Sequence, residues 1–140
     1  MVVDTSVILH VFFEEPGWET SVAYLLRQEV RLLSAASLVE VQAVIAGRTS
    51  VDAFEILDRL LLELKVEIVP LSTEQANIAR MAYLRYGKGR GHRAQLNYGD
   101  VMTYALAKDR SKDRGEVLAF VGDDFNHTDL EAVRLPISSR

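Results

Sequence analysis

The chain of 140 residues is 49% hydrophobic and 26% charged, a balance typical of a soluble globular protein and unlike that of a disordered or fibrous one. It has no cysteine, which excludes disulfides, thiolate zinc sites and cysteine nucleophiles and is compatible with a reducing cytoplasm. The net charge of −4, from 16 basic and 20 acidic residues, argues mildly against a non-specific nucleic-acid binder.

We expect a single domain over residues 1–140, because a chain of this length buries about two thirds of the surface that its unfolded form exposes. The first four residues already read as a strand, so we expect no export signal. The longest apolar stretches, residues 60–64 and 117–121, are far shorter than the roughly 20 residues that span a bilayer. The sequence therefore predicts a cytoplasmic protein that is not embedded in a membrane.

Short β-branched runs alternate with longer segments of helical period along the chain. In chain order, the pattern predicts a strand at 2–4, helices at 6–14 and 19–28, a strand at 30–33, helices at 38–46 and 51–63, a strand at 66–69, helices at 74–86 and 98–108, a strand at 117–121, and an edge strand at 133–137 that Pro136 interrupts. In the last helix, the predicted buried stripe consists of Tyr98, Val101, Met102, Ala105 and Leu106.

This alternation predicts an α/β fold with a parallel sheet, right-handed crossovers and helices on both faces. Ligands of such sheets bind at the carboxyl edge of the strands, near the point where the strand order reverses. No internal repeat or low-complexity segment interrupts the pattern.

Four acidic residues lie where a predicted strand ends or a helix begins: Asp4, Glu40, Asp100 and Asp123. Brought together, these carboxylates would repel one another and resist ionisation unless a hard divalent cation such as Mg²⁺ or Mn²⁺ held them. Neutralised by metal, four such charges would bring the net charge of the remaining chain to about zero, which weakens the objection to nucleic acid. The set predicts metal-assisted phosphate chemistry.

Helix capping is the alternative explanation for three of these residues. Asp4 can cap a helix that starts near Ser6, Ser37 with Glu40 has the spacing of a capping box, and Asn97 with Asp100 places an acid in a first helical turn. Taken singly, each is explained better by capping. Capping does not explain why all of them fall on the sheet edge where ligands bind.

Four segments carry a resemblance to a known family: residues 1–6 (MVVDTS), 34–40 (SAASLVE), 96–100 (LNYGD) with 104–108 (YALAK), and 122–125 (GDDF) with 128–129 (TD). In this order they resemble PIN domains, in particular the VapC toxins of type II toxin-antitoxin systems. The resemblance covers nearly the whole chain, and the ordered set is specific although any one tripeptide is weak.

The resemblance implies a PIN-like, Rossmann-like sheet and an endoribonuclease that depends on Mg²⁺ or Mn²⁺. Such an enzyme hydrolyses RNA to 5′-phosphate and 3′-hydroxyl ends and so arrests translation or growth. It also implies a homodimer that a cognate VapB-type antitoxin neutralises. Asp4, Glu40 and Asp100 match the family's catalytic metal ligands and Asp123 matches a fourth, more variable position, where its neighbour Asp124 remains an alternative.

Two further groups are secondary candidates. The hydroxyl of Thr5 or Ser6 resembles the family's water-positioning or phosphate-contacting group, and an ordinary role at a helix start explains it equally well. The segment 86–93 is basic and rich in glycine, so Lys88, Arg90 and Arg93 are candidates for RNA backbone contacts, with a solvated loop as the alternative. It is not a P-loop, because no Gly-Lys-Ser/Thr follows at the required spacing.

The three histidines, His10, His92 and His127, lack metal-ligand spacing, and none is assigned to catalysis. The first two helices carry more apolar bulk than one side of a small domain requires. Core packing is the simpler explanation for each of these residues, and part of the surface is expected to meet antitoxin or a second copy: Val11, Phe12, Phe13, Trp18, Val22, Leu25 and Leu26.

Rival functions come from other classes. A haloacid-dehalogenase-type phosphatase needs a second aspartate two residues after the first, where this chain has Ser6. A receiver module needs an acidic pair at the end of the first strand, where Asp4 stands alone. The stronger alternative is a PIN-fold interaction protein that retains the site without using it. The sequence alone does not identify the RNA, the antitoxin or the number of metal ions.

Overall fold

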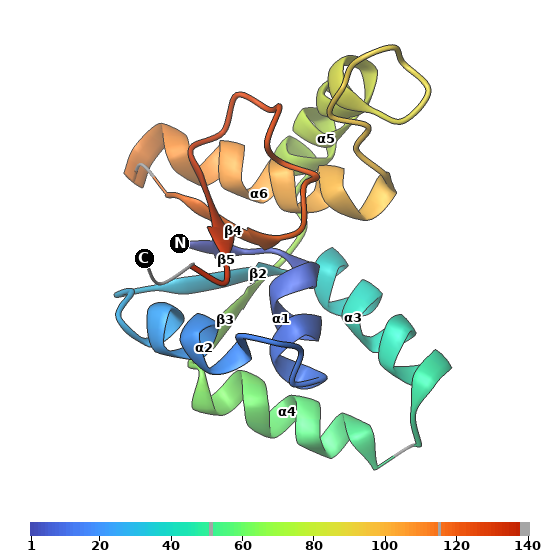
Figure 1. Cartoon of the computed structure of the whole chain (residues 1–140). Helices are drawn as coiled ribbons and strands as arrows, with labels where there is room; N and C mark the ends of the chain where they lie inside the picture. The colour runs from blue at the N-terminus through green and yellow to red at the C-terminus, as the bar shows by residue number, and fades with distance from the viewer. Residues whose placement is uncertain (51, 115, 138–140) are drawn as a thin grey trace.

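A computed structural model describes residues 1–50, 52–114 and 116–137 of the chain (Figure 1). Within these ranges the elements are β1 (Val2–Val3), α1 (Thr5–Phe12), α2 (Trp18–Leu26), β2 (Arg31–Ser34), α3 (Ala35–Arg48), α4 (Ala53–Glu63), β3 (Val66–Val69), α5 (Thr73–Tyr86), α6 (Tyr98–Arg114), β4 (Leu118–Val121) and β5 (Ala132–Leu135). Every predicted element is present, although α3 begins three residues before the predicted 38 and α6 ends six residues after the predicted 108. The predicted helix start at Val51 lies outside the described residues.

The strands form one sheet in the order β3-β2-β1-β4-β5, and every neighbouring pair is parallel. Val2 of β1 pairs with Leu32 of β2 on one side and with Leu118 of β4 on the other. The winding therefore reverses between β1 and β4, which is the switch point where a ligand site is expected. The last strand, β5, lies at the edge of the sheet as predicted, and Pro136 follows directly after it.

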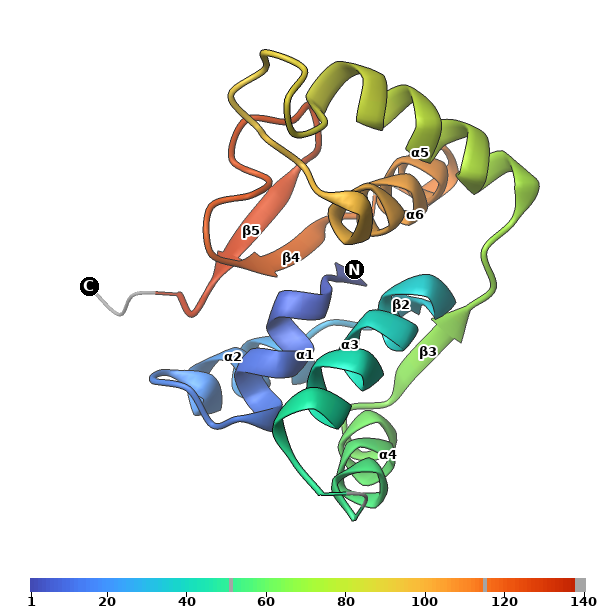
Figure 2. The ribbon, with the colours of Figure 1, turned by 90° about the vertical axis from the view of Figure 1, so that its right-hand side faces the viewer.

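Helices cover both faces of the sheet, with α1 to α4 on one side and α5 and α6 on the other (Figures 1 and 2). Successive strand residues alternate between the two cores: Val2 and Leu32 pack beneath α5 and α6, while Val3 and Leu33 pack against the opposite helices. The central residues of these strands are apolar because both faces of the sheet are covered. The predicted α/β architecture is confirmed.

The prediction that Tyr98 belongs to the buried stripe of the last helix was wrong. The later members of the stripe are buried, with Val101 3% and Met102 8% exposed, but Tyr98 is 75% exposed. The helical period is correct. Tyr98 is the first residue of α6 and borders an open groove beside α5, so its side chain meets solvent although the adjacent Gly99 and Asp100 are buried.

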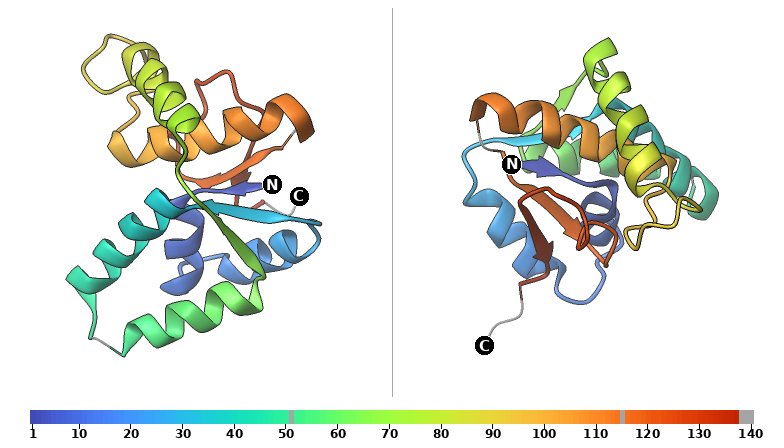
Figure 3. Two further views of the ribbon diagram at one scale, coloured as in Figure 1. Left: turned by 180° about the vertical axis from the view of Figure 1, so that it is seen from behind. Right: turned by 90° about the horizontal axis from the view of Figure 1, so that it is seen from above.

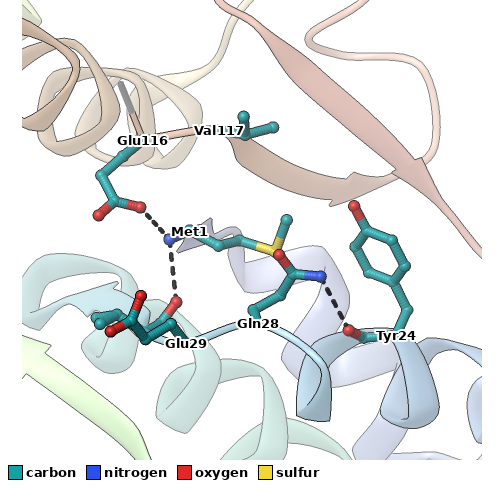
Figure 4. A pocket seen from close by; sticks show the side chains of 7 residues that line it. Met1, Tyr24, Gln28, Glu29, Glu116 and Val117 are labelled. Atoms are coloured by element: carbon teal, nitrogen blue, oxygen red, sulfur yellow. Dashed lines mark hydrogen bonds and ion pairs between the residues drawn. The ribbon is translucent and has the colours of Figure 1, made fainter. Parts of the chain in front are cut away.

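The opposite, amino edge of the sheet contains a small cavity of about 280 Å³ between the starts of β1, β2 and β4 (Figure 4). The Met1 amine there forms an ion pair with Glu116 and donates to the carbonyl of Val30 over 3.0 Å. Gln28 likewise donates to the carbonyl of Tyr24 over 3.2 Å. These polar groups are paired with one another, so the cavity does not compete with the carboxyl edge as a reactive site.

No helix in the described part of the chain is both long enough and apolar enough to cross a membrane.

Candidate active site

Asp4 lies at the end of β1, where it is 4% exposed and caps α1. Its Oδ2 accepts hydrogen bonds from the backbone N–H of Ser6 over 3.0 Å and from the Ser6 hydroxyl over 2.6 Å. Its Oδ1 accepts from the hydroxyl of Thr103 in α6 over 2.7 Å. The predicted cap is therefore confirmed, and the same carboxylate is tied across the sheet edge to the helix that carries Asp100.

Asp100 sits in the first turn of α6 and is 7% exposed. Its Oδ2 accepts from the backbone N–H of Asn97 over 2.8 Å, and its own N–H donates to the Asn97 side-chain oxygen over 2.9 Å. This reciprocal pair has the hydrogen-bond pattern of a capping box, and Asp100 lies in the first helical turn as predicted. It fixes one carboxylate oxygen of Asp100 at the helix start.

The predicted capping box of Ser37 and Glu40 was wrong. The helix starts directly after β2, because the hydroxyl of Ser34 caps it by accepting from the N–H of Ala36 over 3.2 Å. Ser37 is already inside the helix, and its hydroxyl lies 3.1 Å from that of Thr103. The longer helix carries Glu40 on its second turn towards α6.

Glu40 lies directly against Gly99, the residue before Asp100. A Cβ atom at Gly99 would overlap the Glu40 carboxylate, so only glycine leaves room for this approach. A side chain at that position would displace Glu40 from α6. The local sequence Gly99-Asp100 thus combines space for one carboxylate with the placement of another.

The loop after β4 places its two aspartates differently. Asp123 has a 77% exposed side chain, pairs with Arg134 over 3.1 Å and accepts from the Asn126 amide over 3.1 Å. Asp124 is also exposed, but partial burial raises the pKa of its carboxyl, and the charges of Asp4 and Asp123 raise it further. This electrostatic coupling to Asp4 makes Asp124, rather than Asp123, the candidate fourth member of the cluster.

Burial and mutual repulsion disfavour ionisation in this group. The pKa of Asp100 is raised to about 7, first by burial and then by the charges of Asp4, Asp124 and Glu40, against a lowering by the Asn97 backbone. The pKa of Glu40 is raised by burial and by Asp4, although the Thr5 hydroxyl lowers it. Among the described residues, no lysine or arginine forms an ion pair with any of these carboxylates. The protein leaves their charge uncompensated.

The neighbouring hydroxyls orient the cluster. Ser6 bridges Asp4 and the end of β4, since its oxygen also accepts from the N–H of Val121 over 3.0 Å. Thr5 is 5% exposed and its hydroxyl lies 3.5 Å from the carbonyl of Ser37. Sequence reasoning missed Thr103, which is 1% exposed and connects Asp4 with Ser37. Its position three residues after Asp100, on the same helix face, was the available signal.

The donor set fits a hard divalent cation, because all of its atoms are carboxylate oxygens and no lysine or arginine of the described ranges forms an ion pair with them. As the side chains lie, no three acidic or histidine residues of the described ranges are close enough together to hold an ion. Hydrogen bonds hold one carboxylate oxygen of Asp4 and one of Asp100 in place. The positions of these two carboxylates are therefore partly fixed by the fold itself.

The basic loop between α5 and α6 is closed at its base. Lys88 donates its N–H to the carbonyl of Leu96 over 2.8 Å, Leu96 donates to Tyr86 over 2.8 Å, and Leu96 is fully buried. Between these ends Lys88, Arg90 and Arg93 are exposed. The tertiary fold thus holds three cations on the loop that leads into the first turn of α6 (Figure 2).

The apolar residues of the first two helices are mostly packed into the core. Val11 and Leu25 are buried, Phe12, Phe13, Trp18 and Val22 are half-buried, and only Leu26 of this set is largely exposed, at 52%. Core packing accounts for most of them. His10 is buried on α1, and its Nδ1 lies 3.3 Å from Oε2 of Glu15, which is not one of the candidate metal ligands.

Comparisons with known proteins identify the family of the chain. The family model described as PIN domain matches residues 1–130. Ribonuclease VapC30 of Mycobacterium tuberculosis is 43% identical over 97% of this chain and 100% of its own length. Ribonuclease VapC of Mycolicibacterium smegmatis is 42% identical over 95% of this chain and 99% of its own.

Solved structures give the same fold at much lower sequence identity. VapBC2 from Rickettsia felis, bound to a DNA fragment from its promoter, aligns with a TM-score of 0.72 and 14% identity over 95% of this chain and 96% of that one. A toxin-antitoxin complex from Klebsiella pneumoniae aligns with a TM-score of 0.64 and 15% identity over 94% of both chains. With the family match over almost its whole length, the chain belongs to the PIN-domain family, within its VapC group.

Proposed function

We propose that this protein is the endoribonuclease toxin of a VapBC-type toxin-antitoxin system, with hydrolysis of RNA dependent on Mg²⁺ or Mn²⁺. The observation that carries the proposal is the convergence of uncompensated carboxylates at the switch point of a PIN-domain sheet. Relatives named ribonucleases match over nearly the full length of the chain, which supports RNA as the substrate.

Asp4, Glu40, Asp100 and Asp124 would hold the metal, and Asp124 replaces Asp123 in this assignment because of its electrostatic coupling to Asp4. A bound divalent ion supplies positive charge that lowers the pKa of a water nucleophile and polarises the scissile phosphate. The chain's own part is orientation: Ser6 and Thr103 hold the two oxygens of Asp4, and Asn97 holds one of Asp100. Thr5, buried beside Glu40, remains the candidate for positioning the water or phosphate.

A VapB-type antitoxin is the proposed partner, because the two solved structures of similar fold described above are toxin-antitoxin complexes. A homodimer and RNA contacts by Lys88, Arg90 and Arg93 are proposed with it, on the basis of the family resemblance and of the exposure of these cations. From the apolar set on the first two helices, exposed Leu26 and the half-buried side chains are available to the antitoxin: Phe12, Phe13, Trp18 and Val22.

The decisive experiment incubates antitoxin-free protein with total cellular RNA and Mg²⁺ or Mn²⁺ and sequences the new 5′ ends. Discrete 5′-phosphate ends are expected, and they should disappear with a chelator and in both Asp4→Asn and Asp100→Asn. Circular dichroism should show that these two variants remain folded.

Ends that persist in a folded Asp100→Asn variant would reject the assigned site. The absence of new ends from the wild-type protein, together with saturable metal binding, would support the alternative of a PIN-fold interaction protein without catalysis.

A further inference from the structure

A shallow groove of about 430 Å³ runs between α5 and α6 on the side where α6 begins. Its walls combine the aromatic rings of Tyr83 and Tyr98 with apolar Leu84 and Met102 and with the cations Arg80 and Arg90. Arg90 comes from the basic loop, so the groove is continuous with the segment that leads to Asp100. The carboxylate site and the groove lie on two sides of the same helical turn.

Tyr98 is the unusual member of this lining because it is a large aromatic side chain that is 75% exposed. Its neighbours in the groove are exposed as well, with Leu84 at 50% and Tyr83 at 38%. A contiguous apolar and aromatic patch on a small protein is typical of a binding surface, whereas single exposed apolar residues are ordinary. The position of Tyr98, two residues before buried Asp100, links this patch to the proposed reactive centre.

The helix geometry brings the two residues near each other without letting them touch. Two residues advance about 3 Å along the axis and turn the side chain by about 200°, so Tyr98 and Asp100 lie on opposite sides of one turn, about one helix diameter or 10 Å apart. A strand whose phosphate reaches Asp100 and that continues over the start of α6 comes within reach of the Tyr98 ring.

The charge of the groove indicates a polyanion as its occupant. Its lining has two arginines and no acidic residue, and within the described chain neither arginine forms an ion pair. A second copy seated symmetrically on this groove would place arginines against arginines, which is unfavourable. Exposed aromatic faces beside cations are the combination with which proteins bind single-stranded nucleic acid, by base stacking and phosphate contact.

We propose that this groove binds single-stranded RNA next to the scissile phosphate, with a base stacked on Tyr98 and the flanking phosphates held by Arg80 and Arg90. The inference rests on the proposed ribonuclease function and extends it, because it names the substrate form and a positioning residue outside the carboxylate cluster. A duplex is a poor substrate for this arrangement, since its bases are stacked on one another and cannot reach the ring.

The test measures RNA binding separately from cleavage. In an Asp100→Asn background with Mg²⁺, the affinity for a fluorescent single-stranded RNA of mixed sequence is titrated by anisotropy at several salt concentrations. Tyr98→Ala should weaken binding about 5- to 100-fold, whereas Tyr98→Phe, which keeps the ring, should stay within about twofold. Arg90→Ala should weaken binding and also reduce the slope of log affinity against log salt by about 0.7, while Tyr98→Ala leaves that slope unchanged.

Two matched substitutions outside the groove serve as controls. Met81→Ala removes an exposed apolar side chain of α5, and Arg59→Ala removes an exposed cation of α4; neither should change RNA affinity. A duplex of the same sequence should bind more weakly than the single strand and should not respond to Tyr98→Ala.

Unchanged RNA affinity in Tyr98→Ala overturns the inference, and so does a dimer that dissociates in Tyr98→Ala while RNA affinity per protomer stays the same. The latter result would make the groove an interface between copies. A different result would reject the proposed function alone: the wild-type protein would bind RNA through Tyr98 but would cleave none. If wild-type and Tyr98→Ala proteins cleave and bind alike, the ribonuclease proposal survives and the groove inference is lost.

Discussion

Two groups of carboxylates in this protein have opposite electrostatic surroundings. Asp129 accepts from the Tyr104 hydroxyl over 2.6 Å and from Lys108 over 2.8 Å, with Arg85 at 3.8 Å. Burial raises its pKa, but these hydrogen bonds and charges outweigh burial, and the net pKa is lowered. At the sheet edge the pKa of Asp100 rises to about 7, first because the carboxyl is buried and then because its charged neighbours are other acids.

The difference distinguishes an acid that is paired with cations of the fold from acids whose charge no cation of the described residues offsets. At Asp129 the chain supplies its own cations, so ionisation favours the fold. At the sheet edge the chain supplies hydrogen bonds from helix starts, which hold Asp4 and Asp100 in place, but no cation among its described residues. An external divalent ion would relieve this repulsion, and the stability of the fold should report it.

The largest expected effect comes from neutralising one acid in each group. Asp100→Asn should reduce cleavage of a defined RNA by about 1,000-fold or more, because a metal-bound site contributes several kcal/mol to the transition state. Asp129→Asn should keep cleavage within about threefold, since surface ion pairs contribute little. Single-turnover kinetics with saturating Mg²⁺ would measure both rates. Equal losses in the two variants would remove the distinction between the groups.

The pH dependence of stability should differ in sign between the groups. For Asp100 the folded-state pKa of about 7 exceeds the unfolded value of 3.8, so its contribution to metal-free stability is complete below pH 3.8 and is lost as the pH rises towards 7. The loss amounts to about 4 kcal/mol at most. Denaturant unfolding with a chelator, compared between wild-type and Asp100→Asn proteins from pH 5 to 8, measures it.

Magnesium should reverse most of that trend, because binding to the ionised carboxylates stabilises the fold by about 2.7 kcal/mol at one hundred times the dissociation constant. A metal-free Asp100→Asn protein that shows the same slope as wild type would assign the effect to another group.

Substitutions of the two adjacent aspartates after β4 should lower cleavage to different extents. Asp124→Asn should lower cleavage by about 10- to 100-fold, the usual cost of disturbing the surroundings of a metal site. Asp123→Asn should change it by less than about threefold, because Asp123 is exposed and pairs with Arg134 in an ordinary surface ion pair. The opposite ranking, measured under the same single-turnover conditions, would return Asp123 to the site.

Two glycines test whether Glu40 must lie against α6. Gly99→Ala should lower cleavage by roughly 100-fold, because its Cβ displaces the Glu40 carboxylate from a site in which small misplacements are costly. Gly47→Ala in α3 has open space around the new atom, so it should leave cleavage unchanged and stabilise the helix by about 0.5–1 kcal/mol. Full activity in Gly99→Ala would exclude Glu40 as a ligand in its observed position.

The smallest effect should be the stability cost of Asp129→Asn, about 1 kcal/mol at neutral pH, given its partial exposure. Because the pKa of Asp129 is lowered, its contribution is present above the unfolded value of 3.8 and is lost as the pH falls through the folded-state pKa. Thermal unfolding should therefore show a smaller difference from wild type at pH 3 than at pH 7. A difference that grows at pH 3 would contradict the ion pair.

Much of the fold could be predicted because the local signals are strong. Strands such as residues 66–69 are β-branched runs between helical segments, and their predicted bounds match β3. Helix starts were less predictable where two serines compete. Ser34 and Ser37 both have capping chemistry, and only the direct passage from β2 into α3 selects Ser34. The exposure of Tyr98 was unpredictable for a related reason, since periodicity identifies a helix face and does not say where the core beside it ends.

The sequence by itself determined the α/β class, the parallel sheet with helices on both faces, and the location of acids at the ends of strands and the starts of helices. These follow from periodicity and capping chemistry, which act between residues close together in the chain. Only the tertiary structure decided that Thr103 donates to Asp4, that Glu40 fits against Gly99, and that the carboxyl of Asp124 is electrostatically coupled to Asp4. Such contacts join residues distant in sequence, and they depend on how the helices dock on the sheet, which no local pattern encodes.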